Sequence, residues 1–328
     1  MTISQKAILM VIWCILFSVA SSFAQEGYPN KPVQIIVPFA AGGSLDLISR
    51  ILVEKFREYL GQPVLVVNKP GANGTLAAAF VATSKPDGYN VYAAAGMTLG
   101  YFYLMNPNFT YGLNDFSAVA SYAKYPLVMI INKDLPVKNL AELVAYAKKN
   151  PNSLTYGTTG YGSTGHFTIE SLKLKMDIPP ENFPPIHYVG VAPSITAILG
   201  NQVQLAIMPL SALVTKQIEA GAVRALAITG SNRSPFRSDI PIVAEEGFPD
   251  LANTDYLSYW VPAKTPAAII KKLEEATKRA TEDKEVREKI EGLYHEVEYL
   301  NPQEVRKLFD HRVSQFGPLI KKLNIIVK

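Results

Sequence analysis

Two glycine-rich turns in this sequence have the residue types and spacing of anion-binding sites. The first occupies residues 37–46 (VPFAAGGSLD) and the second occupies residues 160–166 (GYGSTGH). Each follows a short apolar run and precedes a predicted helix, so each indicates a strand, a turn and a helix start. A helix start exposes unpaired N–H groups and carries about half a positive charge, and glycine lets another group approach those amides closely. Both turns therefore favour a bound carboxylate or phosphate, with an ordinary strand-to-helix turn as the alternative.

The polar side chains in these turns suit anion binding better than catalysis. Asp46 falls in the first turn of its helix, where a carboxylate stabilises the helix dipole or accepts hydrogen bonds from the turn amides. Ser163 and Thr164 add hydroxyl donors to the second turn, and His166 is expected to donate a hydrogen bond there or to pack inside. His166 and Glu170 have the i,i+4 spacing of metal ligands, but two ligands make an incomplete metal site.

Several enzyme signatures are incomplete. The second turn fits the glycine spacing of a dinucleotide-binding loop, but Asp177 and Glu181 precede the next expected strand instead of ending it. Ser163 is not in a nucleophile elbow, because Tyr161 holds the first glycine position. No pair of carboxylates and no Ser–His–Asp or Cys–His arrangement suggests acid–base or covalent catalysis. The sequence thus predicts no enzyme and no cofactor; an exported hydrolase that uses Ser163 and His166 is the weaker alternative.

The composition is that of an ordinary globular protein. The chain has 328 residues, of which 48% are hydrophobic and 18% charged, and this length suffices for two domains of typical size. The formal net charge of +4 is small, and no basic block or zinc-ligand spacing indicates nucleic-acid binding.

The N-terminal segment has the pattern of a secretory signal peptide. Lys6 is followed by an apolar run at residues 7–20, and the small residues Ser22 and Ala24 predict cleavage after Ala24. A membrane anchor is the alternative, but the run is short for a span of about 20 residues. Cleavage removes Cys14, the only cysteine, so disulfides and thiolate chemistry are excluded in the mature chain.

The rest of the chain alternates expected strands and helices, which indicates an α/β fold with parallel sheets. After a first series, two apolar runs around Lys124-Tyr125-Pro126 predict a long extended stretch that crosses between domains, and a second series follows. The polar, proline-broken residues 231–241 mark the expected crossing back. Three charged amphipathic helices, expected to pack on the first domain, are predicted at 266–281, 284–293 and 302–322.

Six short motifs resemble those of the Bug (TctC-like) receptors of tripartite tricarboxylate transporters. They are YPNKP at 28–32, VPFAAGGSLD at 37–46, LGQPV at 60–64, NKPGA at 68–72, KPDGY at 85–89 and GSTGH at 162–166. The resemblance covers essentially all of the mature chain, in the right order. It implies a type II periplasmic-binding-protein fold, in which two α/β lobes joined by two crossover strands close over a ligand in the cleft between them.

The resemblance also implies lobe boundaries and ligand contacts. Lobe I would comprise residues 25–123 and 236–328, and lobe II residues 124–235. In such receptors the Pro-Phe-x-Ala-Gly-Gly turn holds a ligand carboxylate through backbone amides and ordered water, and the Gly-Ser-x-x-His turn of the other lobe opposes it. The predicted ligand-binding residues are Phe39, Ala41, Gly42, Gly43, Ser44, Asp46, Thr98, Tyr161, Gly162, Ser163, Thr164, His166, Gly190 and Met208.

Two departures from the family pattern bear on the ligand. The turn that ends at Gly190 lacks the lysine and one glycine of the family, and Met208 stands where the family often has an aspartate. The loss of that acid disfavours an amino-acid ligand, whose ammonium group needs a carboxylate partner. Tyr161 fits an apolar or aromatic carboxylate better than citrate. The expected ligand is therefore a small organic carboxylate, aromatic or dicarboxylic.

The implied function is capture of this carboxylate in the periplasm by a monomer, followed by delivery to the permease subunits of a tripartite transporter. The alternative is a periplasmic sensor that uses the same lobes to signal to a two-component histidine kinase. The sequence itself does not separate the two.

Overall fold

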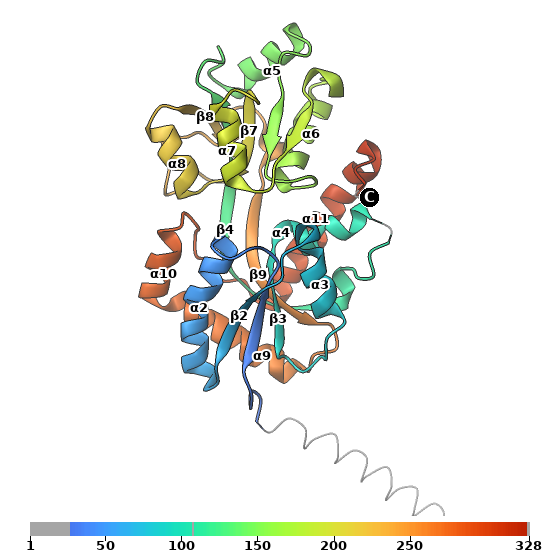
Figure 1. Cartoon of the computed structure of the whole chain (residues 1–328), viewed down its shortest axis with the longest axis vertical. Helices are drawn as coiled ribbons and strands as arrows, with labels where there is room; N and C mark the ends of the chain where they lie inside the picture. The colour runs from blue at the N-terminus through green and yellow to red at the C-terminus, as the bar shows by residue number, and fades with distance from the viewer. Residues whose placement is uncertain (1–26, 107, 327–328) are drawn as a thin grey trace, which may run out of the picture.

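The computed structural model describes residues 27–106 and 108–326, and the predicted signal peptide at 1–24 lies outside them. Figure 1 shows two lobes, one above the other, that are connected by strands β4 (Phe116–Asn132) and β9 (Thr254–Pro262). Each lobe is a sheet with helices packed on it. The α/β class with two lobes and two connecting strands, which the sequence patterns predict, is therefore confirmed.

Lobe I, the lower lobe in Figure 1, contains strands in the order β2-β1-β3-β9-β4. The parallel strands are β1 (Val33–Val37), β2 (Val64–Asn68) and β3 (Asn90–Ala95). Strand β9 pairs antiparallel with both β3 and β4. Four of the five residues of β1 are buried, as expected for a parallel strand covered on both faces.

Lobe II, the upper lobe, continues from β4 in the order β4-β7-β5-β6, and β8 pairs with β4 as well. Its strands are β5 (Tyr156–Thr158), β6 (Pro185–His187), β7 (Leu205–Pro209) and β8 (Val223–Ile228). Strands β5, β6 and β7 run parallel to one another, whereas β7 and β8 run antiparallel to β4.

Strand β4 runs through both lobes without a break. Its first part pairs with β9 as far as Pro126, which lies opposite Thr254, and its second part pairs with β7 from Leu127, which lies opposite Pro209. Because Pro126 lies where β4 changes partner, the missing N–H of the proline is tolerated. The long crossing stretch predicted around Pro126 is confirmed.

Helices cover the two sheets (Figure 1). Those of lobe I are α2 (Ser44–Leu60), α3 (Thr75–Ala82), α4 (Gly96–Gly100), α9 (Ala267–Glu282), α10 (Lys284–Glu291) and α11 (Pro302–Leu323). Those of lobe II are α5 (Leu140–Lys149), α6 (Thr164–Lys175), α7 (Val191–Leu199) and α8 (Ala212–Glu219). The C-terminal helices pack on the first lobe as expected, since α9 contacts α2 and α11 contacts β4. Helix α11 also reaches α6 of lobe II.

Residues 236–253 lie on lobe II, although the proline-broken pattern predicts the return crossing at 231–241. Glu246 accepts a hydrogen bond from the amide of Leu140 at the start of α5, and Asp250 pairs with Lys175 at the end of α6. Polar residues and prolines indicate a loop but do not indicate which lobe the loop covers. We propose that the return crossing begins near Thr254, with β9, instead of at residue 236.

The packing of α2 on its sheet depends on Phe56, which is 1% exposed and lies edge-on to Tyr259, with ring centroids 5.6 Å apart. We expect Phe56→Ala to lower the free energy of unfolding by about 3–5 kcal/mol, because it leaves a cavity in a closed core. Urea unfolding measures this change. Glu54→Ala, at an exposed position of the same helix, is the matched control and should stay within about 0.5 kcal/mol. Equal losses in the two variants would contradict this packing.

Candidate functional site

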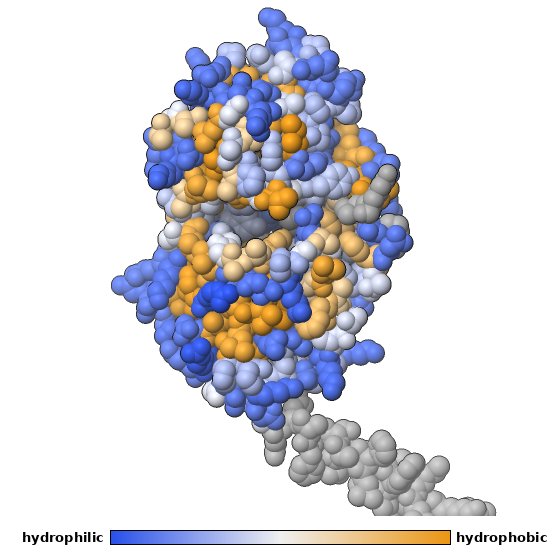
Figure 2. Space-filling model, viewed as in Figure 1, coloured by the Kyte–Doolittle hydropathy of each residue, from blue (hydrophilic) through white to orange (hydrophobic). Residues whose placement is uncertain are grey.

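The parallel strands of the two lobes end at edges that face each other. In lobe I, β3 ends at Ala95, opposite Leu257, where β9 arrives from lobe II. In lobe II, β7 ends at Pro209, opposite Leu127, where β4 arrives from lobe I. The strands parallel to β3 and β7 end at the same two edges, and Figure 2 shows a hollow between the lobes. We call this hollow the cleft; ligands of open α/β sheets bind at such carboxyl ends.

Four of the described helices that follow parallel strands, α2, α3, α7 and α8, begin without a side-chain cap. Helix α2 of lobe I follows Gly43 and helix α7 of lobe II follows Gly190, and neither glycine offers a capping oxygen. Helix α6, which follows β5, is capped by Ser163, and helices α5, α10 and α11, which follow no parallel strand, are capped by Asn139, Asp283 and Asn301. The first amides of α2 and α7 are thus left for an anion in the cleft.

The Asp46 carboxylate fixes the shape of the lobe I turn. It accepts hydrogen bonds from the Gly42 amide and the Asn68 side chain, both at 2.9 Å, and from Arg50 at 2.9 and 3.1 Å. The Gly42 backbone is left-handed, with φ 89°, and Asn68 also donates to the Phe39 carbonyl. Burial alone would raise the pKa of Asp46, but the bonds from Arg50, Gly42 and Asn68 hold it below its usual value. Asp46 therefore supports the turn as an ionised group.

The rest of the lobe I turn exposes mainly backbone, and few side chains, to the cleft. Ala41, Gly42 and Gly43 are exposed, and Phe39 and Ser44 are partly exposed. Thr98, in the short helix α4 that follows β3, is fully buried, and its hydroxyl donates to the carbonyl of Ala95, 3.0 Å away. Its predicted ligand contact stays a prediction.

Ser163 and His166 shape the lobe II turn. Ser163 caps α6 by accepting the His166 amide at 3.3 Å, and the Gly162 amide donates to Nδ1 of His166 at 3.1 Å. A neutral ring whose Nδ1 accepts carries its proton on Nε2. Burial, with smaller contributions from His187 and Lys173, lowers the pKa of His166 to about 3. His166 is therefore neutral at physiological pH and holds the turn through Nδ1.

His187, for which the sequence predicts no role, lies beside this turn. Its ring centroid is 4.5 Å from that of His166 and 5.1 Å from that of Tyr161, and its Nδ1 shares a hydrogen bond with the Thr158 hydroxyl at 2.8 Å. The pairing of β5 with β6 places Thr158 opposite His187. The sequence feature that could have indicated His187 is its position at the end of β6, directly before the Gly190 turn.

The Gly190 turn adds an apolar side chain to the lobe II edge. Gly190 has φ 99°, and a Cβ added there would meet no atom within 4 Å, so the space beside it is open. Val189, directly before it, is 94% exposed. The Gly190 amide itself donates to the Thr159 carbonyl, but the first amides of α7 follow it. Helix-start amides beside an exposed valine suit a ligand with a charged end and a hydrocarbon part.

Seven predicted ligand contacts are buried in this conformation, among them Met208 and Thr164. Met208 of β7 lies opposite Val128 inside the lobe II core and has no exposed surface. Thr164 is 2% exposed, and its hydroxyl bonds with Tyr101 and Asp255. Neither side chain is accessible to a ligand here, so both roles stay predictions.

Glu170 bonds with residues other than His166. Its carboxylate bonds with Nζ of Lys173 and with the hydroxyl of Tyr156, each at 2.7 Å. Among the described residues, no three His, Cys, Asp or Glu side chains are grouped as metal ligands. In the same part of the chain, no helix is both long and apolar enough to cross a bilayer.

We expect the free energy of unfolding to fall as the pH drops from about 6.5 towards 4. Burial lowers the pKa of His166 to about 3 and that of His295 to about 4, and it also lowers that of His187. An unfolded histidine titrates near 6.5, so below that pH the unfolded chain binds more protons and gains stability. At pH 5, His166 alone accounts for about 2 kcal/mol of the loss.

The variant His166→Gln keeps an acceptor for the Gly162 amide and should remove this share of the pH dependence. Urea unfolding at pH 7 and pH 5 measures the difference for both proteins. The same pH dependence in the variant and the wild type would show that His166 is not held neutral.

This chain is similar in sequence and structure to known proteins. Residues 48–325 match the family described as the tripartite tricarboxylate transporter family receptor. A UPF0065 protein of Agrobacterium vitis is 37% identical over 277 residues, which cover 82% of this chain and 77% of that one. MatC of Rhodopseudomonas palustris, solved with bound malate, is 27% identical with a TM-score of 0.77, and the match covers 89% of this chain and 100% of that one. An R. palustris protein solved with adipate is 27% identical with a TM-score of 0.80, covering 91% and 99%.

Proposed function

Since this chain belongs to the receptor family of the tripartite tricarboxylate transporters, we propose that it captures a small organic dicarboxylate between its lobes and delivers it to a membrane permease. The observation that carries this proposal is that α2 and α7, from opposite lobes, begin at uncapped glycines on the two facing edges. A ligand with a carboxylate at each end can accept hydrogen bonds from both sets of amides. The malate and adipate held by similar structures support this ligand class.

In this proposal each lobe binds one end of the ligand. Lobe I contributes the amides of Gly43 and Ser44, with Phe39 and Ala41 beside them, while the Gly42 amide is bonded to Asp46, which supports the turn. Lobe II contributes the first amides of α7, since the Gly190 amide itself donates to the Thr159 carbonyl, and His166 holds the Gly162 turn through Nδ1. The ring of Tyr161, which is partly exposed, and the side chain of Val189 would contact the hydrocarbon part.

The charges at the cleft edges favour a dicarboxylate over an amino acid. Of the acids at these edges, Asp46 is bonded to Arg50 and Asp255 is paired with Arg312. A ligand ammonium group would therefore have to compete with an arginine for either carboxylate. The helix starts of both lobes favour negative charge instead.

Delivery to the permease depends on the difference between the ligand affinities of the closed and open arrangements of the lobes. A ligand that touches amides of both lobes binds the closed arrangement more tightly than the open one, so it shifts the population towards closure. A closed receptor offers the permease a surface that combines both lobes. We further propose that this monomer works in the periplasm, as relatives described as periplasmic do, after export by residues 1–24.

Adipate, malate, benzoate and aspartate, each titrated into the mature chain, test the ligand class. We expect adipate or malate to bind, and a concentration 100-fold above Kd stabilises the fold by about 2.7 kcal/mol, which thermal unfolding detects as a rise of several degrees. Isothermal titration gives the affinities, and aspartate should bind more weakly than adipate and malate. Tight binding of aspartate alone would contradict the ligand class, and the absence of any carboxylate binding would contradict the function.

Gly43→Val tests the lobe I amides. The Gly43 backbone is extended (φ −74°, ψ 161°), and a Cβ there meets nothing closer than the Ala40 carbonyl at 3.7 Å, so the fold should be retained. The added side chain would fill the space in front of the first amides of α2. We therefore expect Kd to rise at least about 100-fold, or ~2.7 kcal/mol.

Gly112→Val is the matched control. Gly112 is also extended (φ −141°), and a Cβ there meets the ring of Tyr103 at an ordinary 3.6 Å. It precedes the end of β4 that lies farthest from lobe II, so Gly112→Val should leave Kd unchanged. Undiminished affinity in Gly43→Val would show that the lobe I turn does not bind the ligand.

A further inference from the structure

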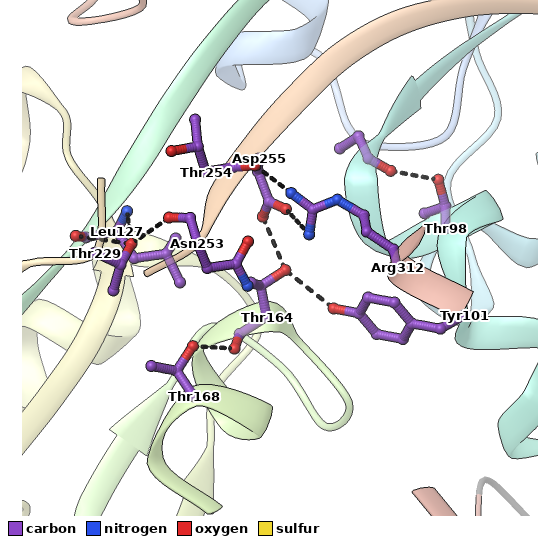
Figure 3. A network of polar contacts seen from close by, with 11 residues as sticks. Thr98, Tyr101, Leu127, Thr164, Thr168, Thr229, Asn253, Thr254, Asp255 and Arg312 are labelled. Carbon is purple, nitrogen blue, oxygen red and sulfur yellow. Dashed lines mark hydrogen bonds and ion pairs between the residues drawn. The ribbon is translucent and has the colours of Figure 1, made fainter. Parts of the chain in front are cut away.

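The N-terminal turn of α6, which carries part of the proposed lobe II site, is fastened to lobe I (Figure 3). The hydroxyl of Thr164 lies 2.8 Å from Oδ2 of Asp255 and 3.0 Å from the hydroxyl of Tyr101. Tyr101 follows α4 of lobe I, and Asp255 lies on the crossing strand β9. A threonine hydroxyl has one proton; since Thr164 donates it to the Asp255 carboxylate, it accepts the proton of Tyr101. All three side chains are at most 4% exposed.

Arg312 of α11 holds Asp255 in place. Its Nη1 lies 3.2 Å from Oδ1 of Asp255, and its Nη2 donates to the carbonyl of Thr254. Gly96, the first residue of α4, leaves room for this pair, because a Cβ there would lie 2.7 Å from Oδ1 of Asp255. Burial raises the pKa of Asp255, while Arg312 and the Thr164 hydroxyl act in the opposite direction. Thr164 thus binds to a carboxylate that lobe I has already fixed.

Apolar contacts support the same connection between the lobes. Met105, in the short helix Phe102–Met105 of lobe I, packs so closely on Gly162 that a Cβ there would lie 2.3 Å from its methyl group. Phe167 of α6 packs against the rings of Tyr101 and Phe316, with centroids 5.1 and 5.3 Å apart. The start of α6 belongs to lobe II by its strand connections, yet it shares a hydrophobic cluster with lobe I.

We propose that Tyr101, Thr164, Asp255 and Arg312 form an interlobe latch that holds the lobe II half of the ligand site against lobe I before the ligand arrives. This inference rests on the proposed function. Thr164 is the positioning residue of the latch, because its hydroxyl joins lobe I while its amide lies in the first turn of α6, at the cleft edge. Any opening that draws α6 away from lobe I breaks both hydroxyl bonds together.

The latch makes ligand affinity depend on lobe closure in the free protein. A ligand that binds only closed lobes has an apparent Kd equal to the intrinsic Kd divided by the closed fraction. A latch that raises the closed fraction therefore lowers the apparent Kd without touching the ligand. It also slows ligand release, since release requires the same two hydroxyl bonds to break.

The distance between the lobes tests the latch without any ligand. The mature chain has no cysteine, so Glu54→Cys on α2 and Lys216→Cys on α8, both exposed, can be spin-labelled selectively. Double electron–electron resonance then gives the distribution of interlobe distances. Thr164→Val removes the hydroxyl and keeps the amide and the shape, and we expect it to broaden the distribution and shift it from that of the wild type. Thr164→Ser keeps the hydroxyl and should restore the wild-type distribution.

Adipate binding gives the second readout. Thr164→Val should raise the Kd for adipate at least fivefold, mainly through faster dissociation, and Thr164→Ser should restore both values. A merely structural role of Thr164 would lower the melting temperature and leave the ligand-free distance distribution unchanged, which would overturn the proposal. If the wild type binds no carboxylate, the proposed function fails, but the ligand-free distances still decide whether the latch exists.

Tyr101→Phe keeps the latch testable should Thr164→Val fail to fold. This variant removes one hydroxyl and leaves the ring packing on Phe167 in place. We expect the interlobe distance distribution to change in the same direction as for Thr164→Val. The change should be smaller, because the bond from Thr164 to Asp255 remains. Distance distributions of Tyr101→Phe and the wild type that coincide would refute the latch. Asp255→Asn is unsuited to this test, because it leaves the buried charge of Arg312 without its partner.

Discussion

The continuity of strand β4 is the constraint on which the rest of the structure depends. In lobe I, β9 lies between β4 and β3 and is antiparallel to both, so the parallel strands of lobe I run in the direction of β4. In lobe II, β7 pairs with β4 directly and antiparallel, so β7 and its neighbours run against it. The two sets of parallel strands therefore point at each other, and this alone brings the glycine turns of both lobes to one cleft.

The cleft can bind an anion because two helices at its edges begin without the side-chain caps that would otherwise stabilise them. A side-chain cap contributes about 0.5–2 kcal/mol to a helix, and α2 and α7 both begin without one. The lobe I turn is stabilised from inside its helix by Asp46, whose charge Arg50 offsets. Asp46 pairs with the Gly42 amide and fixes the turn, so the first amides of α2 are held in place for an anion. This is the preorganised state that an anion binds with the smallest reorganisation.

Local sequence patterns predict the element order, the crossing strand and the glycine turns, because each depends on residues close together in the chain. The partners of these turns depend on contacts between distant residues. Thr164 meets Asp255, 91 positions away, and His187 meets His166 only because β5 and β6 pair. Residues 236–253 show the same limit, since their composition indicates a loop but its partners lie on α5 and α6. Met208, in a strand buried on both faces, has no periodicity that separates the core from the cleft.

The arrangement of the lobes along the chain has a consequence for how the protein is made. Lobe II lies in one stretch of the chain, whereas lobe I needs β9 and α11 from the far end. A chain that emerges N-terminus first completes lobe II while β3 and the first part of β4 still lack the strand that lies between them. Unpaired strand edges associate readily with other chains. A newly made chain therefore carries two open strand edges until its last third arrives.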